Sequence, residues 1–558
     1  MDARKSFLKG AFILSIAGAI SKVLGAVYRI PLAYLIGAAG IGIYQKAYPI
    51  YTLILALATA GVPVAISALI ASKEEQGVSG DSQKLFRLSL VILFSAGVLL
   101  SLAVVLLSDF LANYVLRDPQ TRLAIIAVAP AIFISGMMSV FRGYFQGHQM
   151  MLPTAISQVV EQLFRVVSIL LLAYLLLPRG MDFAVAGATG GAVIGGIAGL
   201  IIMIFFFLRF QHEKTRAGHQ LLYSKASYRT LAKQMIIMAI PVSFGAAVLP
   251  LVQMLDAIIV PARLMFIGYN LEEANILFGQ LSGMSAVLIS LPTIFTIAIS
   301  TSLVPAVSEA LTQNNRALLC ERINNGIRVG AVISFPSATG LFVLAFPIGL
   351  LLYNQESVGL TLAPLAFSAI TLAAFQISSA SLQGLGRPEI SMRHLLVAGG
   401  LKVVFNYTLT TIPELNIVGP AVGTVIAFFI GSLLNLISLH KLCRVRYEAP
   451  RLIKIALLCV FMGVVVSLSY TGIQAQLYQW LITLPAYSPA VDPGNLFASA
   501  PIDYLLETEK LLESARVSAS KIATCIAMVI GVAFYAGGLV LTKEFDISTV
   551  KQMIRFRD

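Results

Sequence analysis

The sequence contains little charge for its length, and this excludes a water-soluble protein. Only 12% of its 558 residues are Asp, Glu, Lys or Arg, whereas 58% are hydrophobic and the mean hydropathy is +0.87. A soluble domain has about a quarter of its residues charged. Hydrophobic runs of about twenty residues recur along the whole chain, and each is long enough to cross a bilayer core of about 30 Å. We therefore expect the chain to cross a membrane many times.

Cysteines and phosphate-binding loops are scarce as well. The four cysteines are scattered, so the sequence predicts neither a disulfide framework nor a metal site (Cys320, Cys443, Cys459 and Cys525). No Walker-type glycine-rich loop is present, so we do not expect ATP to be used. The basic start Met1–Lys9 is followed by a long apolar run without a small-residue cleavage site. The first helix is therefore expected to be retained.

The apolar runs are continuous and do not alternate, which is typical of helices that satisfy their own backbone polar groups in lipid. We predict an all-α polytopic protein with about fourteen transmembrane helices, at 10–36, 47–71, 88–107, 123–141, 154–177, 185–208, 234–260, 276–301, 329–352, 361–383, 394–412, 418–439, 454–473 and 521–541.

Basic residues predict the orientation, because cytoplasmic loops are enriched in Lys and Arg. With a cytoplasmic N-terminus, the basic clusters at 209–233, at 440–454 and in the tail from Lys543 all lie inside. Both termini are then cytoplasmic. The net charge of +13 reflects this bias and suits anionic lipid headgroups, so we do not expect nucleic-acid binding.

The second half of the sequence repeats features of the first at a spacing of about 235 residues. Gln146-Gly147 followed by Pro153 is matched by Gln383-Gly384 followed by Pro388, and Arg165-Val166-Val167 by Lys402-Val403-Val404. Each half holds six helices, so both enter the membrane in the same orientation. This predicts two pseudo-two-fold-related six-helix lobes with a substrate path between them.

We place the lobes at 1–208 and 234–440, joined by a basic cytoplasmic linker at 209–233. Two additional helices lie in 441–558, with an extracytoplasmic loop at 474–520 that serves either as a lineage-specific loop or as a docking site. The helix from Gly187 to Gly199 is dense in glycine. That density predicts close helix packing, with a hinge as the alternative.

Ionisable residues at membrane depth are costly, so each is a functional candidate. Lys22 and Arg29 lie seven apart on one face of the first helix, without an acidic residue nearby in sequence. They are expected to line a cavity, although Arg29 could instead reach the outer interface. Glu161 and Arg165 are an i,i+4 pair, either a structural ion pair or part of the cavity.

The second half supplies further candidates. Asp256 and Arg263 lie seven apart on the seventh helix, where Arg263 either lines the cavity or lies at the interface. Lys402 and Asn406 are four apart on the eleventh helix. Arg142 is expected in a cytoplasmic loop. The sum of these charges is positive, and such a cavity suits a phosphate-bearing anion, since Arg offers forked donors and Lys a point charge. An exporter of cations should show the reverse.

Three stretches of the sequence resemble one family: Ser21–Leu32 (SKVLGAVYRIPL), Phe141–Gly147 (FRGYFQG), and the segment from Pro153 to Val166. The chain resembles the multidrug/oligosaccharidyl-lipid/polysaccharide (MOP) exporter superfamily. Within it, the chain is most similar to the branch of stage V sporulation protein B and YtgP-type, MurJ-like lipid II flippases. The resemblance covers nearly the whole chain. It implies two six-helix lobes around a central cavity that opens alternately to each side.

The resemblance also implies roles for particular residues. Related MurJ flippases line their cavity with basic residues on the first helix and in the second lobe. Lys22 matches one of these by position, Arg29 lies one residue past another, and Arg263 is the second-lobe candidate. The arginine of their second helix has no counterpart here, although Lys46 lies near the start of that helix.

Some relatives are proposed to bind sodium between helices seven, eleven and twelve. Asp256, Asn406 and Thr424 would contribute here, but Lys402 would sit close by, and its fixed charge would replace the ion. We therefore expect no metal.

The resemblance predicts a flippase of the bacterial cell membrane rather than an enzyme. It would move an undecaprenyl-pyrophosphate-linked saccharide, lipid II or a related precursor, from the inner to the outer leaflet. We expect no cofactor; the membrane potential or an ion gradient would drive transport, and cell-wall synthesis proteins are the expected partners. The alternatives are a drug or cation antiporter of the same superfamily and a polyprenyl-sugar ligase or polymerase.

Overall fold

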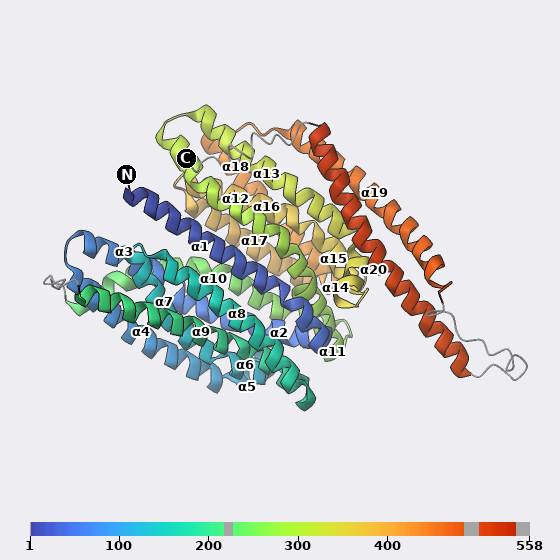
Figure 1. The fold of residues 1–558 in the computed structure, drawn as a ribbon, viewed down its shortest axis with the longest axis horizontal. Helices are drawn as coiled ribbons and strands as arrows, with labels where there is room; N and C mark the ends of the chain where they lie inside the picture. Colours follow the sequence, from blue (N-terminus) through green and yellow to red (C-terminus); the bar gives the residue numbers. More distant parts are fainter. Residues whose placement is uncertain (1, 217–226, 485–501, 543–558) are drawn as a thin grey trace, which may run out of the picture. The chain divides into compact units, whose positions relative to one another are not determined.

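Helices make up nearly all of the described chain. The computed structural model describes residues 2–216, 227–484 and 502–542, and no strand occurs in these ranges. The elements follow one another (Figure 1) as α1 (Asp2–Val27), α2 (Arg29–Thr59), α3 (Val62–Glu75), α4 (Ser79–Leu106), α5 (Ser108–Phe110), η1 (Leu111–Val115), α6 (Thr121–Val128), α7 (Pro130–Gly147), α8 (Met151–Leu176), η2 (Leu177–Arg179), α9 (Met181–Arg216), α10 (Tyr228–Phe266), α11 (Leu271–Phe278), η3 (Gly279–Ser285), α12 (Ala286–Thr312), α13 (Arg316–Val343), α14 (Ala345–Tyr353), α15 (Val358–Ala366), α16 (Ser368–Gly384), α17 (Pro388–Leu409), α18 (Val418–Cys443), α19 (Ala449–Leu481) and α20 (Ile502–Leu541).

The helical, membrane-spanning class is confirmed. Each predicted range lies on one helix or on consecutive ones. Among the described residues, eleven helical stretches are long and apolar enough to cross a membrane, or twelve if the bent pair α15 and α16 forms one span. The stretch Ile16–Glu75 counts once there although it contains two predicted helices, and α17, which carries Arg393, Lys402 and Asn406, is not among them. The number fourteen therefore stays a prediction.

Two helix breaks can be traced to single residues. The first predicted helix, 10–36, ends where expected, because Gly37 inside α2 has a φ of 64° that interrupts the helical backbone. The predicted helix 123–141 is split before Pro130, which begins α7 at a position where its missing N–H costs nothing. The new helix then runs to Gly147. Arg142 consequently lies within α7, so its expected place in a loop is wrong.

The two longest predicted loops are wrong at their ends. Helix α9 continues to Arg216 and α10 begins at Tyr228, so both ends of 209–233 are helical. Likewise α19 continues to Leu481, and the amphipathic stretch from Ile502 belongs to the same helix as the last span. Helical hydrogen bonding does not stop where the apolar run stops, so polar ends prolong these helices. The centres of both loops (217–226 and 485–501) and the basic tail from Lys543 lie outside the described residues.

Contacts between Cα atoms divide the chain into two compact units. Unit 1 comprises 1–294 and 392–423, and unit 2 comprises 295–391 and 424–558. This grouping places α10 and α11 with the first six predicted helices; the predicted lobes and their two-fold relation stay predictions. Of the candidate residues named from the sequence, Thr424 belongs to unit 2 and the others belong to unit 1.

Each unit has its own apolar core. In unit 1, α3, α4, α7, α9 and α10 enclose a cluster in which the ring of Phe86 contacts Phe141, Tyr144 and Phe207, with ring centroids 4.6 to 5.3 Å apart. In unit 2, Val307, Ile323 and Leu382 belong to the core formed by α12, α13, α16 and α18.

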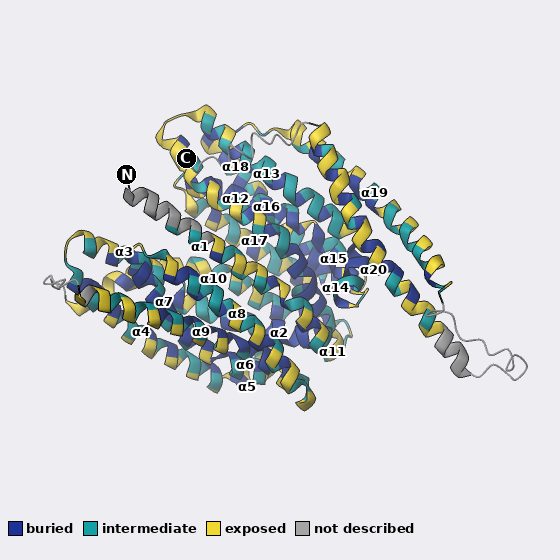
Figure 2. Cartoon of the chain, viewed as in Figure 1, coloured by how far each residue is buried: buried dark blue, intermediate teal, exposed yellow. Residues whose placement is uncertain are grey.

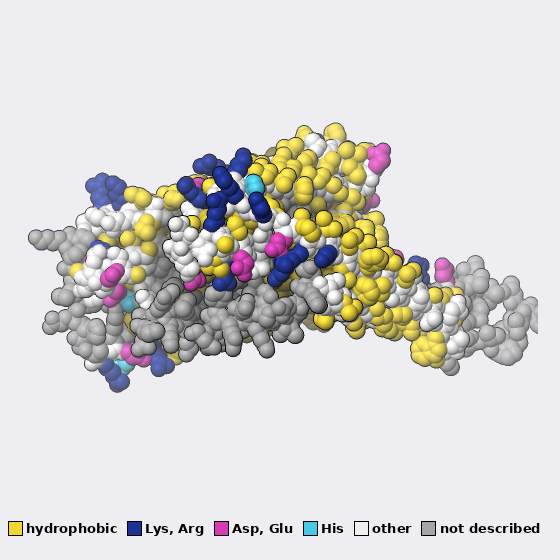
Figure 3. Space-filling model, turned by 90° about the horizontal axis from the view of Figure 1, so that it is seen from above, with side chains coloured by type: hydrophobic (Ala, Val, Ile, Leu, Met, Phe, Trp, Pro, Cys, Tyr) yellow, Lys and Arg dark blue, Asp and Glu magenta, His cyan; other side chains and the backbone are white. Residues whose placement is uncertain are grey.

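The outer faces of the helices are hydrophobic. On α19, for example, Val460, Phe461 and Leu468 are 61%, 62% and 68% exposed, whereas α7 is buried along most of its length (Figure 2). Lys and Arg side chains gather in patches that leave broad hydrophobic areas free of charge (Figure 3). Exposed apolar bands of this kind are what a lipid bilayer covers.

Candidate functional site

The first two helices bring Arg29 among tyrosines. Arg29 begins α2 and interacts with the phenols of Tyr28, Tyr44 and Tyr48, and its buried Nε has no hydrogen-bond partner. The hydroxyls of Tyr28 and Tyr44 lie 3.1 Å apart. No ion pair joins Arg29 to an acidic side chain of the described residues. Lys22 lies earlier, on α1, and is exposed.

A row of stacked rings runs along α2 from this point. Tyr44 and Tyr48 stack with ring centroids 5.3 Å apart, and Tyr48 and Tyr51 are 5.5 Å apart. We call Tyr44, Tyr48 and Tyr51 the tyrosine row. Tyr48 lies within electrostatic reach of both Arg29 and Arg165. The row therefore links the arginine of the first span to a second group of arginines on α7 and α8.

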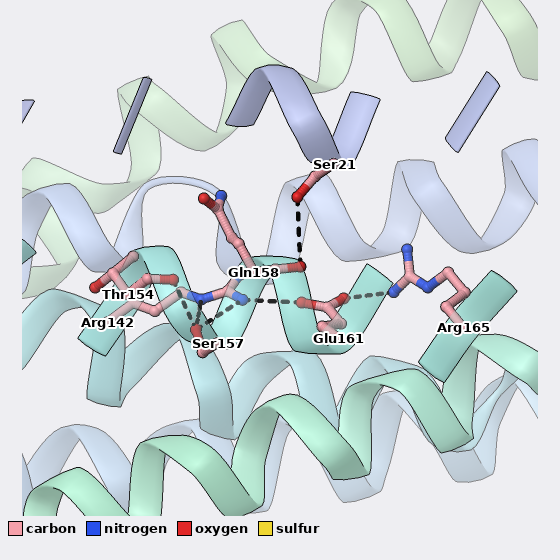
Figure 4. A network of polar contacts seen from close by, with 7 residues as sticks. All are labelled: Ser21, Arg142, Thr154, Ser157, Gln158, Glu161 and Arg165. Carbon is pink, nitrogen blue, oxygen red and sulfur yellow. Dashed lines mark hydrogen bonds and ion pairs between the residues drawn. The ribbon is translucent and has the colours of Figure 1, made fainter. Parts of the chain in front are cut away.

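That second group has two guanidinium groups on one carboxylate (Figure 4). Arg142 Nη2 donates to Glu161 Oε2 at 2.8 Å, and Arg165 Nη2 donates to Glu161 Oε1 at 2.6 Å. Arg142 also donates from Nε and Nη2 to Ser157 Oγ, at 3.3 Å in each case. The side chains of Arg142, Glu161 and Arg165 are 18%, 12% and 16% exposed. We call these three residues the arginine–glutamate cluster; its net charge is positive.

Neighbouring helices hold this cluster in place. From α1, Ser21 Oγ donates to the backbone oxygen of Gln158 at 3.4 Å (Figure 4). From α9, Gly195 and Gly199 lie directly against it: a Cβ at Gly195 would be 2.6 Å from Arg165 Cβ and 2.7 Å from the Glu161 backbone oxygen, and one at Gly199 would be 3.1 Å from Glu161 Cβ. The glycine-rich helix is therefore a close-packing surface, as predicted, and it supports α8 behind the two charges.

The candidates from the second half of the sequence meet between α10 and α17. Lys402 Nζ donates to Asp256 Oδ2, and Asn406 Nδ2 donates to Asp256 Oδ1 at 2.6 Å. The proximity of these three side chains is confirmed. The side chains of Asp256 and Lys402 are each 15% exposed, and the pair is neutral. The ammonium group of Lys402 contacts Asp256 Oδ2, an oxygen that would otherwise be available to a bound cation.

Arg263 lies two turns beyond Asp256 on α10, as its spacing predicts. Its guanidinium carbon lies 3.4 Å from the ring centroid of Tyr407 and 5.5 Å from that of Phe266. It lines an open pocket of about 730 Å³ together with Arg117, Tyr114 and apolar residues of α10. A cation over aromatic faces keeps its hydrogen-bond donors available for an anion.

The sequence does not predict the fully buried ion pair between Lys46 and Asp118. Lys46 Nζ lies 2.9 Å from Asp118 Oδ2, and both side chains are 0% exposed. Asn275 of α11 donates to the same carboxylate oxygen at 2.9 Å. Asp118 thus neutralises Lys46. Lys46 is therefore not a free cation that could stand in for the second-helix arginine that this sequence lacks. Asp118 follows η1 in an apparent loop, and no spacing rule connects it to Lys46.

The residues fall into two positive groups and two neutral pairs. The positive groups are Arg29 with the arginine–glutamate cluster, and Arg263 on its aromatic rings. The neutral pairs are Asp256–Lys402 and Lys46–Asp118. The structure does not join Lys22 to any of these groups. Aromatic faces and forked donors at low exposure suit a planar or multiply charged anion better than a cation.

Comparison with known proteins agrees with the fold. The family model described as "Polysaccharide biosynthesis protein" matches residues 7–311, and the MatE model matches 280–408. Stage V sporulation protein B of Bacillus subtilis is 31% identical over 444 residues, covering 79% of this chain and 84% of that protein. Lipid II flippase MurJ of the same organism is 26% identical over 498 residues, covering 85% and 89%.

A solved structure supports the same class. The inward closed conformation of lipid II flippase MurJ has a TM-score of 0.63 with 16% identity and covers 92% of this chain and 98% of that one. The fold is that of a multi-pass membrane transporter, and the relatives are transporters and flippases rather than enzymes. The chain belongs to the polysaccharide biosynthesis protein family of the MOP superfamily, in the branch of stage V sporulation protein B and MurJ.

Proposed function

We propose that the protein is a flippase that moves a lipid-linked saccharide diphosphate, lipid II or a related undecaprenyl-pyrophosphate precursor, from the inner to the outer leaflet of a bacterial cytoplasmic membrane. The observation that carries the proposal is Arg29. It lies among tyrosine rings in a stretch that is long and apolar enough to span a membrane, with no acidic partner among the described residues. A cation without an acidic partner in such a stretch is costly, so its presence favours an anionic ligand.

The headgroup is expected to pair with Lys22, Arg29 and Arg263, while the prenyl tail stays in lipid. Rocking of the lobes then exposes the headgroup to the other side, with both termini remaining cytoplasmic. No bond is broken, so the pairing side chains only bind and release. The names of the relatives, stage V sporulation protein B and lipid II flippase MurJ, support this substrate class. The cell-wall synthesis proteins that consume the product are the proposed partners.

The driving force is proposed to be the membrane potential or an ion gradient. The Asp256–Lys402 pair supports a potential-driven cycle without sodium bound at this carboxylate, because a tethered ammonium already neutralises it. Movement of an anionic headgroup outward is favoured by a potential that is negative inside. Transport is therefore expected to proceed equally well with sodium or potassium as the only monovalent cation.

The test uses cells depleted of their own lipid II flippase. A lipid II-cleaving enzyme added outside reports how much precursor has reached the outer leaflet. The wild-type chain is expected to restore cleavage, and Arg29→Ala with Arg263→Ala to lower it more than tenfold, because each lost guanidinium–phosphate contact is worth about 1.5–3 kcal/mol. Arg209→Ala is the matched control, since Arg209 is 66% exposed in a surface pair with Glu213.

Amounts of each variant in the membrane are compared first. The proposal fails if the wild-type chain, correctly inserted, restores no cleavage, or if the double variant restores it fully. Efflux of cationic dyes that depends on Asp256 and Glu161 would instead identify a cation antiporter.

A further inference from the structure

The charges around the tyrosine row do not balance. Arg29, Arg142 and Arg165 supply three guanidinium groups, and Glu161 is the acidic side chain paired with any of them among the described residues. Each phosphorus of a diphosphate that joins a prenol to a sugar has one ionised oxygen. The surplus of two positive charges in this group therefore matches the two negative charges of such a diphosphate.

The carboxylate of Glu161 occupies the position that suits a phosphoryl group. Its two oxygens accept from guanidinium groups on two different helices, at 2.8 Å and 2.6 Å. Figure 4 shows Arg142 and Arg165 reaching Glu161 from opposite sides. Arginine forks bind carboxylate and phosphate with the same geometry, so one can replace the other without moving the guanidinium groups far.

Two donors on α8 are unused. Arg165 Nε and the hydroxyl of Thr154 are buried without a hydrogen-bond partner. Buried polar atoms are normally paired. The three charged side chains keep 12–18% of their surface exposed, so a ligand can reach them.

We propose that Glu161 is a displaceable internal anion, and that the diphosphate of a lipid-linked substrate takes its place between Arg142 and Arg165 while Arg29 binds from the other end of the tyrosine row. The proposal rests on the proposed function for the identity of the substrate. When the site is empty, Glu161 keeps the two guanidinium groups paired. When the diphosphate has to leave, the returning carboxylate competes for the same donors, and release becomes faster.

The first test is binding of two probes, inorganic pyrophosphate and farnesyl diphosphate, to the purified full-length protein in lipid nanodiscs. Glu161→Gln is expected to bind farnesyl diphosphate about tenfold more tightly than the wild type, because the internal competitor is lost. Arg142→Gln and Arg165→Gln are each expected to bind it about tenfold more weakly.

The matched control is Asp109→Asn. It removes the same charge from a pair, Asp109 with Arg122 at 2.5 Å, but Asp109 is 64% exposed and lies away from the cluster. This control is expected to leave the affinity unchanged. Size-exclusion profiles and melting temperatures establish that every variant is folded before its affinity is compared.

The results separate this inference from the proposed function. If folded Glu161→Gln binds neither probe more tightly than the wild type, the displaceable-anion proposal is refuted, and Glu161 only bridges two helices. If pyrophosphate gains affinity but farnesyl diphosphate does not, the lipid-linked ligand is refuted. If Glu161→Gln tightens binding but slows transport in the depleted cells, both proposals are supported. If binding tightens and the wild-type chain does not restore transport, the anion site stands and the flippase proposal falls.

Discussion

Replacing Gly195 by alanine is expected to separate α8 from α9, whereas the same change at Gly190 on the same helix is expected to be harmless. The two glycines differ in what a methyl group would meet. At Gly195 the new Cβ would lie 2.6 Å from Arg165 Cβ and 2.7 Å from the Glu161 backbone oxygen. At Gly190 the nearest atom would be Ala127 Cβ, at 3.9 Å, which is ordinary van der Waals contact.

The size of the effect follows from these distances. Ordinary contact begins near 3.4 Å, so α8 has to move away by about 0.8 Å at Gly195, and the atoms in the way belong to or adjoin the backbone. Overpacking of this kind costs about 1–3 kcal/mol. Both variants gain the same amount, about 0.5–1 kcal/mol, from the higher helix propensity of alanine. Their difference therefore isolates the packing cost.

The free energy of unfolding of each purified variant is measured by titration with a denaturing detergent. We expect Gly190→Ala to be as stable as the wild type or slightly more stable, and Gly195→Ala to be less stable than Gly190→Ala by about 1–3 kcal/mol. Equal stabilities would refute the claim that these helices touch through the glycine. The same movement shifts Glu161 and Arg165, so Gly195→Ala should also weaken binding of farnesyl diphosphate.

Two further predictions concern other parts of the chain. Asp118→Asn is expected to lower the free energy of unfolding by about 3–5 kcal/mol, because it leaves a fully buried Lys46 unpaired. Adding Lys46→Met to this variant should recover most of the loss. If Asp118→Asn alone is as stable as the wild type, the pairing is contradicted. Tyr447, in the connection before α19, donates to the Leu436 backbone oxygen at 2.5 Å, and burial raises its pKa to about 12. A raised pKa favours the protonated form in the folded state, so its contribution is full below about pH 10 and is lost as the pH rises to 12. The difference in stability between the wild type and Tyr447→Phe should shrink over this range, and a constant difference would contradict the assignment.

Several features of the site could be predicted from the sequence because they depend on short spacings. The Glu161–Arg165 pair follows from i,i+4 geometry on one helix, and the packing role of Gly195 from a run of small residues. The tyrosine row could have been recognised in the same way, since Tyr44, Tyr48 and Tyr51 recur at helical spacing. The resemblance to known transporters predicts that Asp256 and Lys402 lie close together, although they are 146 residues apart in the sequence.

Other features depend on tertiary contacts that no local pattern encodes. Asp118 lies 72 residues from Lys46 and follows a short helical turn, so nothing in its neighbourhood indicates a buried carboxylate. Arg142 was expected in a loop because its place depends on a restart of the helix at Pro130. The surplus of positive charge around Glu161 becomes visible only when α7 and α8 are brought together.

The contact of α2 with α11 and η3 has a consequence for any transport cycle. A Cβ at Gly42 would lie 2.0 Å from the Asn275 backbone oxygen, one at Gly279 would lie 2.1 Å from that of Ala38, and Gln45 donates to the Ser282 backbone oxygen at 2.8 Å. The two backbones are thus as close as glycine permits. Helices meshed in this way cannot slide past one another. At these contacts the segments are expected to move together as one rigid body, because neither backbone can shift along the other without a clash.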